Sequence, residues 1–221
     1  FPSPDDVPDP AAAAQAALKL IAVVNDARER SNEPFSMRVD DGDVLRTIDH
    51  LAYKYFCLSP DEIALIDDTV EVILPALHPH EGHFPKLWGA PDEPQRAQYA
   101  HTLSASLADW FKGKKIDARL VARGADLAIL RLHLGGHEDY AEDAAGELSE
   151  VLEQLAAHIH RPLDGNFQLM PDLRVFVGDC LYLIKPMQMR FWLRSTALAD
   201  ADGIALDLQQ AAAQPQQRGA D

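Results

Sequence analysis

Residues 173–185 read Leu-Arg-Val-Phe-Val-Gly-Asp-Cys-Leu-Tyr-Leu-Ile-Lys, two β-rich runs on either side of a Gly-Asp pair. A Gly-Asp pair between two such runs is typical of a two-residue hairpin turn. A second stretch upstream has the same character. Apolar residues alternate along 116–121 and again along 127–134, with a glycine between the two runs. The sequence therefore predicts two β-hairpins.

Helical patterns separate the two hairpins and follow the second one. Leucines at the spacing of one helix face mark a predicted helix over about 138–160, and another is predicted over roughly 196–213. Residues 113–213 thus have the predicted order ββαββα. A four-stranded antiparallel sheet with helices on one face would bury both the strand alternation and the helix stripes, so we predict an α+β fold.

The N-terminal part is predicted to be a helical subdomain. Apolar residues, Ile21 and Val24 among them, recur at helical spacing over 11–30. Ser59-Pro60-Asp61-Glu62 is a helix-start signal, and a further helix is predicted from Pro94. The predicted organisation is a disordered lead-in over 1–10, a helical subdomain over 11–112, an α+β subdomain over 113–213 and a frayed tail over 214–221.

Composition restricts the classes of function. The chain has 221 residues, 47% of them hydrophobic, and a net charge of −15. Phosphate contacts need Lys and Arg, so this charge argues against a surface that binds nucleic acid throughout and favours a basic protein partner. No apolar run has the length of a membrane helix and no secretory signal stands at the start, so we expect a cytoplasmic protein without membrane contact.

The two cysteines, Cys57 and Cys180, lie in apolar surroundings. We expect two reduced thiols in the core of a cytosolic protein. A disulfide or a metal site is the alternative, although no Cys-x-x-Cys pair occurs that would indicate a zinc knuckle.

One histidine cluster has spacing suited to a metal. Residues 77–83 read Leu-His-Pro-His-Glu-Gly-His, so that His78, His80 and His83 could converge on Zn²⁺. The spacing resembles the HxHxDH motif of metallo-β-lactamase-type hydrolases, but Gly82 stands where that motif has Asp. The simpler interpretation is a polar loop that contains histidines. Phosphate-binding glycine loops and the Gly-x-Ser-x-Gly nucleophile elbow are absent from the sequence.

Basic residues gather in two segments, 112–131 and 185–194, although the chain as a whole is acidic. In the second segment Arg190 and Arg194 flank Trp192 just before a predicted helix. Cations beside an aromatic ring, next to a helix N-terminus, are suited to contact with phosphates or bases. In the alternative interpretation Trp192 anchors the core, and Arg190 and Arg194 pair with Asp200 and Asp202. The candidate residues for binding nucleic acid or a partner are Lys112, Lys114, Lys115, Arg119, Arg123, Lys185, Arg190, Trp192 and Arg194.

Several segments carry a family resemblance. They are Tyr182-Leu-Ile-Lys-Pro, Arg190-Phe-Trp-Leu-Arg, Ala197-Leu-Ala-Asp-Ala-Asp, the stretch 48–68 with its Leu-Ser-Pro-Asp-Glu-Ile, and the stretch 99–110. Together they resemble the C-terminal region of large bacterial adenine-N6 DNA methyltransferases and of restriction–modification and phage-defence proteins. The resemblance spans about 44–208.

The resemblance implies a non-catalytic role. The family's Asn/Asp-Pro-Pro-Tyr/Phe motif and its glycine-rich S-adenosylmethionine loop are both absent. We therefore expect no catalytic activity and no cofactor in this chain alone. As part of a larger enzyme it would belong to a DNA adenine-N6 methyltransferase.

Three functions remain as hypotheses. The first is an accessory or C-terminal domain of a bacterial DNA-modification or phage-defence system, which contacts the DNA backbone or a catalytic protein partner. The second is an acidic protein-interaction or regulatory module without a nucleic-acid role, in which Lys and Arg are engaged in internal salt bridges. The third is a zinc-dependent hydrolase that uses His78, His80 and His83.

Overall fold

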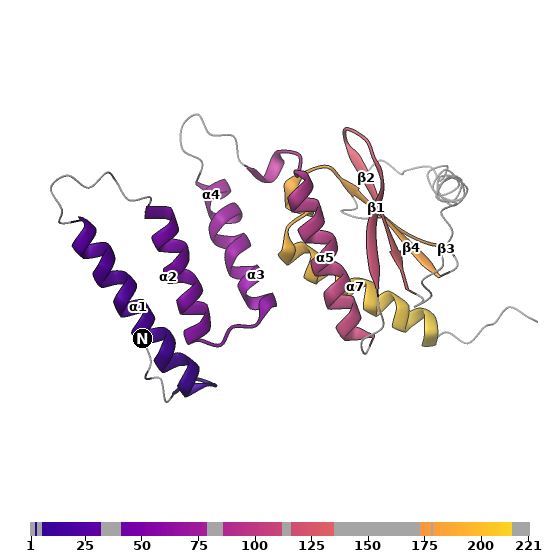
Figure 1. The fold of residues 1–221 in the computed structure, drawn as a ribbon. Helices are drawn as coiled ribbons and strands as arrows, with labels where there is room; N and C mark the ends of the chain where they lie inside the picture. The colour runs from indigo at the N-terminus through magenta and orange to yellow at the C-terminus, as the bar shows by residue number, and fades with distance from the viewer. Residues whose placement is uncertain are drawn as a thin grey trace, which may run out of the picture. The chain divides into compact units, whose positions relative to one another are not determined.

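The computed structural model describes two compact units, and Figure 1 draws their elements. They are residues 1–66 and 67–221. The chain is a mixed helix-and-sheet protein with a four-stranded antiparallel sheet, which confirms that much of the predicted fold class. The described residues are 3, 6–31, 41–78, 86–111, 116–134, 173–177 and 179–213.

The first unit contains a helix pair with a small core. Ala13 and Ala16 of the first helix are buried against Tyr55 of the second. Ile21 and Val24, which the sequence pattern places on the apolar face, are instead 58% and 39% exposed. The contact between the two helices therefore forms on the alanine side of the first helix. The helices are α1 (Pro10–Ser31), α2 (Asp41–Tyr55) and α3 (Pro60–Asp68).

The start of α3 is the capping box that the sequence predicts. The Glu62 carboxylate accepts hydrogen bonds from the Ser59 backbone N–H at 2.8 Å and from the Ser59 hydroxyl at 2.9 Å. In return the Glu62 backbone N–H donates to the Ser59 hydroxyl oxygen at 3.3 Å. These bonds favour the ionised carboxylate and lower the pKa of Glu62 from its ordinary value of 4.5, the backbone bond contributing most.

The second unit begins with short helices and then a long one. The long helix starts with a reciprocal capping box between Asp92 and Gln95, and it buries Tyr99, Leu103 and Leu107 on one face. The elements are η2 (Thr69–Ile73), α4 (Leu74–Leu77), η3 (Lys86–Trp88) and α5 (Glu93–Trp110).

The sheet consists of the two predicted hairpins. Its strand order is β1-β2-β4-β3, every neighbouring pair is antiparallel, and Leu130 lies opposite Leu183 where the two hairpins meet. The register of β1 on β2 shifts between Leu120 and Ala122, which indicates a β-bulge. The strands are β1 (Asp117–Arg123), β2 (Leu127–His133), β3 (Leu173–Val177) and β4 (Cys180–Pro186).

The core of the second unit lies between one face of this sheet and two helices, α5 and α7 (Arg194–Ala213). Alternate residues of the central strands face the helices, for example Leu181 and Leu183, while Tyr182 faces the other way and is also buried. The helix predicted over 138–160 lies outside the described residues, so the order ββαββα is not observed in full.

The unit boundary differs from the predicted boundary between 112 and 113. Helix α5, assigned by sequence to the helical subdomain, belongs to the second unit because Leu103 and Leu107 pack into the core of the sheet. Helical periodicity marks an apolar face but not the layer that covers it.

The two cysteines are free, but only Cys180 is buried, whereas Cys57 is exposed. Within the described residues, no helix combines the length and apolarity needed to cross a membrane.

The capping box generates a pH prediction. A carboxyl whose folded pKa is depressed contributes stability above its unfolded pKa, and that contribution is lost as the pH falls through the folded value. We expect NMR titration to place the pKa of Glu62 below 4.5, and Ser59→Ala to raise it only part of the way because the backbone N–H remains. An unchanged Glu62 pKa in Ser59→Ala would show that the hydroxyl bond has no effect.

Candidate functional site

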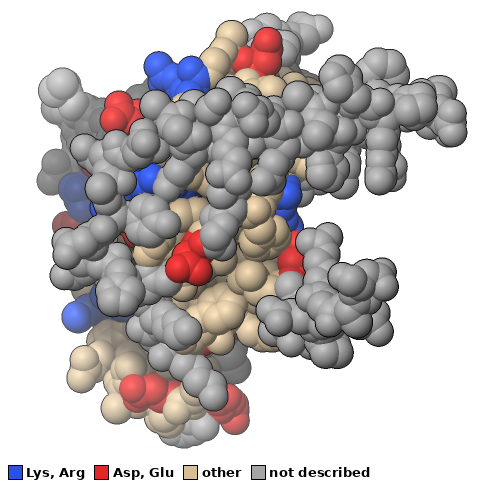
Figure 2. All heavy atoms as spheres, turned by 90° about the vertical axis from the view of Figure 1, so that its right-hand side faces the viewer, with Lys and Arg blue, Asp and Glu red and all other residues tan. Residues whose placement is uncertain are grey.

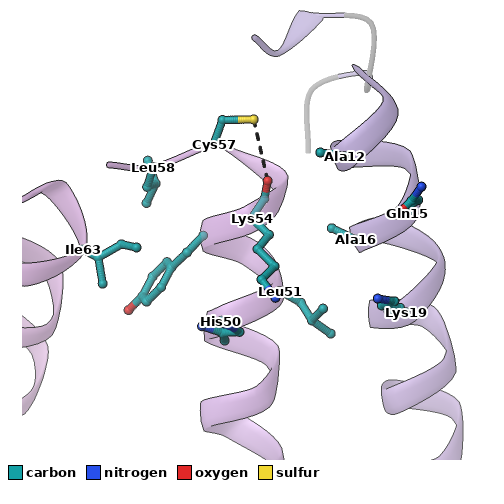
Figure 3. A pocket seen from close by; sticks show the side chains of 11 residues that line it. Ala12, Gln15, Ala16, Lys19, His50, Leu51, Lys54, Cys57, Leu58 and Ile63 are labelled. Atoms are coloured by element: carbon teal, nitrogen blue, oxygen red, sulfur yellow. Dashed lines mark hydrogen bonds between the residues drawn. The ribbon is translucent and has the colours of Figure 1, made fainter. Parts of the chain in front are cut away.

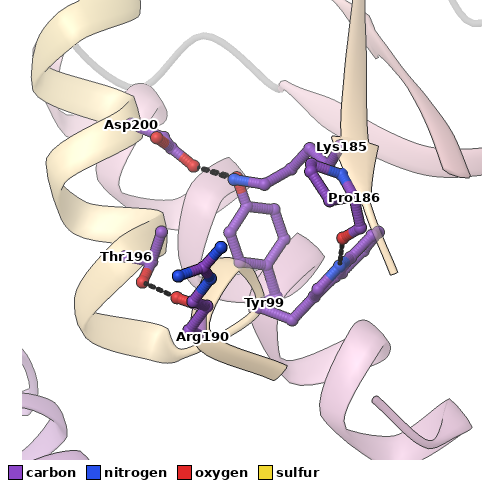
Figure 4. Close-up of polar contacts among 7 residues, drawn as sticks. Tyr99, Lys185, Pro186, Arg190, Thr196 and Asp200 are labelled. Atoms are coloured by element: carbon purple, nitrogen blue, oxygen red, sulfur yellow. Dashed lines mark hydrogen bonds and ion pairs between the residues drawn. The ribbon is translucent and has the colours of Figure 1, made fainter. Parts of the chain in front are cut away.

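A buried ion pair joins three elements of the second unit (Figure 4). The Lys185 ammonium, at the end of β4, donates to the Tyr99 hydroxyl of α5 at 2.8 Å and pairs with the Asp200 carboxylate of α7. The Tyr99 hydroxyl donates to the same carboxylate. The ammonium also lies 4.4 Å from the centroid of the Tyr99 ring, within the range of a cation–π contact.

Burial makes these contacts obligatory. The side chain of Lys185 is 1% exposed and that of Asp200 is 14% exposed. An isolated buried charge is strongly unfavourable, and lysine is almost never fully buried without a partner. The contacts of Lys185 join β4 to α5 and α7, so the three side chains hold these elements together inside the second unit.

Trp192 is part of the same interior. It is 1% exposed, its indole N–H donates to the carbonyl of Pro186 at 2.8 Å, and its ring meets Tyr99 edge-on at 5.3 Å between centroids. This environment agrees with the alternative in which Trp192 anchors the core. An indole buried in this way has no face free to stack on a base.

Arg194 is engaged with the end of α3. Its guanidinium pairs with Asp67 at 2.7 Å and lies 3.8 Å from Asp68. Asp68 is 7% exposed and accepts a hydrogen bond from the Ser195 backbone N–H, in the first turn of α7, at 2.6 Å. The predicted pairing of Arg194 with Asp200 or Asp202 is wrong: Asp200 pairs with Lys185, and Asp202 accepts from Trp110 at 3.1 Å.

Arg190 stacks on aromatic rings. Its guanidinium carbon lies 4.5 Å from the ring centroids of both Trp88 and Phe191. Among the described residues it forms no ion pair, so the predicted pairing with Asp200 or Asp202 is not found for Arg190 either. The planar stacking uses the guanidinium faces and ties η3 to the segment before α7.

Of the remaining predicted cations, some lie within the described residues and others lie outside them. Arg119 and Arg123 lie exposed on β1, and Arg119 pairs with Asp117 at 2.5 Å. Lys112, Lys114 and Lys115 lie outside the described residues, as do His80 and His83. His78 follows α4. In the described ranges no three His, Cys, Asp or Glu residues are grouped so that they could hold a metal ion, and the zinc site over His78, His80 and His83 stays a hypothesis.

A groove between α5 and β1 has no counterpart in the sequence prediction. Its volume is about 700 Å³, and Leu130 and Trp192 belong to its lining. Arg96 also lines it, although this side chain is only 8% exposed. The groove brings together one face of a helix and one strand, a pairing that no local motif reveals.

The first unit has a cavity of about 510 Å³ between α1 and α2 (Figure 3). Cys57 lies on its lining with a positive φ of 53°, and its thiol donates to the carbonyl of Lys54 at 3.7 Å. The Leu58 N–H donates to the Tyr53 carbonyl and the Cys57 N–H to the Lys54 carbonyl, so Cys57 takes the left-handed end of a Schellman motif, usually a glycine position.

Comparisons of the chain with protein-family models, curated proteins and solved structures find no match. The resemblance to the C-terminal region of adenine-N6 DNA methyltransferases therefore stays a hypothesis. The function of the chain has to be inferred from its own described side chains.

The buried ion pair generates a stability prediction. We expect Lys185→Met to lower the free energy of unfolding by about 3 kcal/mol or more, because it leaves the Asp200 carboxylate without its cation. The double variant Lys185→Met/Asp200→Leu should regain most of that loss, since no buried charge remains. Chemical denaturation of the wild type, the two single variants and the double variant measures the coupling. Losses that simply add would show that the two groups do not depend on each other.

Proposed function

We propose that this chain is an acidic, non-catalytic protein-interaction or regulatory module. The observation that carries the proposal is the engagement of its cations. Lys185 is buried with Asp200, and Arg194 pairs with Asp67. Arg174 likewise pairs with Asp207 at 2.6 Å. Cations held in this way are not available to phosphates, which supports a protein rather than a nucleic-acid partner.

The distribution of charge on the surface also supports a protein partner. On the face that Figure 2 draws, the described Lys and Arg side chains lie in separate small groups with acidic side chains near them. A binding face for nucleic acid requires clustered cations. With a net charge of −15, the chain repels phosphates at long range and attracts a basic partner.

The proposal includes the order ββαββα for 113–213. The described hairpins support it, since β2 pairs with β4 and the two hairpins thereby form one sheet. The predicted helix over 138–160 supplies the remaining element between β2 and β3. In this arrangement the module presents β1 at one edge of the sheet.

A second candidate is an accessory domain of a bacterial DNA-modification or phage-defence system that contacts the DNA backbone. The observation that favours it is the exposure of Arg119 and Arg123 on β1. In the sequence they follow Lys112, Lys114 and Lys115. This candidate shares with the first a protein partner, and the two differ in whether this chain contacts DNA.

DNA binding over a salt series distinguishes the two candidates. We expect the purified full chain to bind neither duplex nor single-stranded DNA at about 50 mM salt, where electrostatic contacts are strong. The matched variant is Arg119→Gln/Arg123→Gln, which removes the exposed cations of β1 without touching Lys185 or Arg194. Salt-sensitive binding that this variant loses would establish the second candidate.

Affinity capture tests the protein-interaction proposal itself. We expect the tagged full chain to co-purify with a discrete protein from nuclease-treated extract of its host cell, and a reconstituted mixture of the two purified proteins to form the same complex. Recovery of nucleic acid alone, or failure of the purified proteins to associate, would contradict the proposal.

A further inference from the structure

We propose that the groove between α5 and β1 binds an extended segment of a partner protein that carries a carboxylate. The segment adds to β1 as an extra strand and places its carboxylate against Arg96. This inference rests on the proposed function and names the chemistry of the partner. Three features of the groove lead to it: a buried cation that forms no ion pair with any described residue, the balance of charge around it, and a strand edge.

Arg96 is a buried cation without a counter-charge among the described residues. Its guanidinium donates to the carbonyl of Pro91 at 2.5 Å, but its Nε has no hydrogen-bond partner there and it forms no ion pair. Arginine is rarely so buried unless it is paired, because water no longer solvates the charge. Lys185, which is still more deeply buried, has Asp200 as its ionic partner. An anion from outside the described residues would give this charge on Arg96 an ionic partner, and a carboxylate matches its planar, two-pronged donor geometry.

The charges around Arg96 restrict which anion fits. Arg123 is a second cation in the lining, exposed at the end of β1. Of the two acids in the lining, Asp117 is paired with Arg119, and Glu93 occupies the first turn of α5 where the helix dipole favours it. Arg96 and Arg123 together can therefore balance the charge of one or two carboxylates on the partner segment. A strongly acidic segment would be repelled by Glu93.

The strand edge selects an extended peptide. In the described sheet β1 is an edge strand, with β2 on one side. The Ala118 backbone N–H donates to the Ser104 hydroxyl of α5 at 3.1 Å, which shows that Ala118 directs its N–H away from β2 and that α5 already engages this position of the edge. Since hydrogen-bonding direction alternates along an antiparallel strand, Leu120 presents its N–H and C=O on that same outer side. A further strand would therefore pair with β1 through main-chain bonds at Leu120, beyond the position that Ser104 engages.

Apolar contact completes the match. Ala118 and Leu120 both line the groove, and Leu120 is 41% exposed, whereas Leu130 and Trp192 in the lining are each 1% exposed and offer almost no surface. An added strand directs every second side chain toward this surface. Nucleic acid lacks the alternating N–H and C=O groups that pair with a strand edge, so the edge favours a peptide over DNA.

The probes are fluorescent heptapeptides of alternating Val and Thr with one central Asp or Glu, measured by fluorescence anisotropy on the full chain. Each has a neutral counterpart with Asn or Gln, and a version N-methylated at alternate residues that cannot pair as a strand. We expect the acidic peptides to bind, and both the neutral and the N-methylated versions to bind at least about tenfold more weakly.

Variants of the chain assign the binding to the groove. Arg96→Gln should weaken binding of the acidic peptide about tenfold or more, and Arg96→Lys should give an intermediate affinity. The control is Arg46→Gln, which should have no effect because Arg46 lies outside the groove lining. Leu120→Pro removes the outward N–H and should weaken binding, whereas Leu120→Ala keeps it and should weaken binding less. Circular dichroism and thermal unfolding establish that each variant is folded.

Each outcome decides between the claims. Equal binding of acidic and neutral peptides, or of Leu120→Pro and Leu120→Ala, overturns the groove assignment. Peptide binding that vanishes as the chain dimerises through β1 assigns the edge to a second copy and overturns it too. If no peptide binds while the reconstituted partner complex forms, the inference fails and the proposed function stands. If the peptides fail and DNA binds, both fail.

Discussion

The second unit depends on keeping one ammonium group out of water. Lys185 lies near the end of β4, one of the two central strands of the sheet, and its charge is stabilised by Tyr99 of α5 and Asp200 of α7. The three groups thereby fix where both helices lie on the sheet. Hydrophobic burial alone has no direction and would tolerate a shift of either helix. The pair of charges limits that freedom, because a small displacement would leave a buried charge unpaired, and the Arg174–Asp207 pair adds a second ionic contact between the sheet and α7.

Packing within the second unit also engages the other cations of this region. The segment 185–194, whose sequence indicates a candidate for anion binding, instead makes contacts that join the end of α3, α5, β4 and α7. Trp192 packs on Tyr99, Arg190 lies against aromatic rings, and Arg194 pairs with Asp67. The guanidinium of Arg96 differs from these cations, since Lys185, the other buried cation of the described residues, has an ionic partner within the chain.

Local sequence patterns were sufficient for the local structure. Period-two alternation and turn residues predict both hairpins, and Ser59 with Glu62 predicts the start of α3. The partners of Lys185 and Arg194 could not be predicted. Tyr99 and Asp67 are far from them in the sequence, and no local motif links the members of either pair. Nor could the groove, which exists only because α5 packs beside β1. Periodicity reports which residues avoid water and leaves their partners undetermined.

The most direct test of this account is NMR of the full chain with ¹⁵N-labelled lysine side chains, with and without duplex DNA. A buried, ion-paired ammonium exchanges its protons slowly, and we predict one such signal, which Lys185→Met removes. Added DNA should leave it in place. Rapid proton exchange at Lys185, or a shift of its signal with DNA, would contradict the claim that this charge serves the interior.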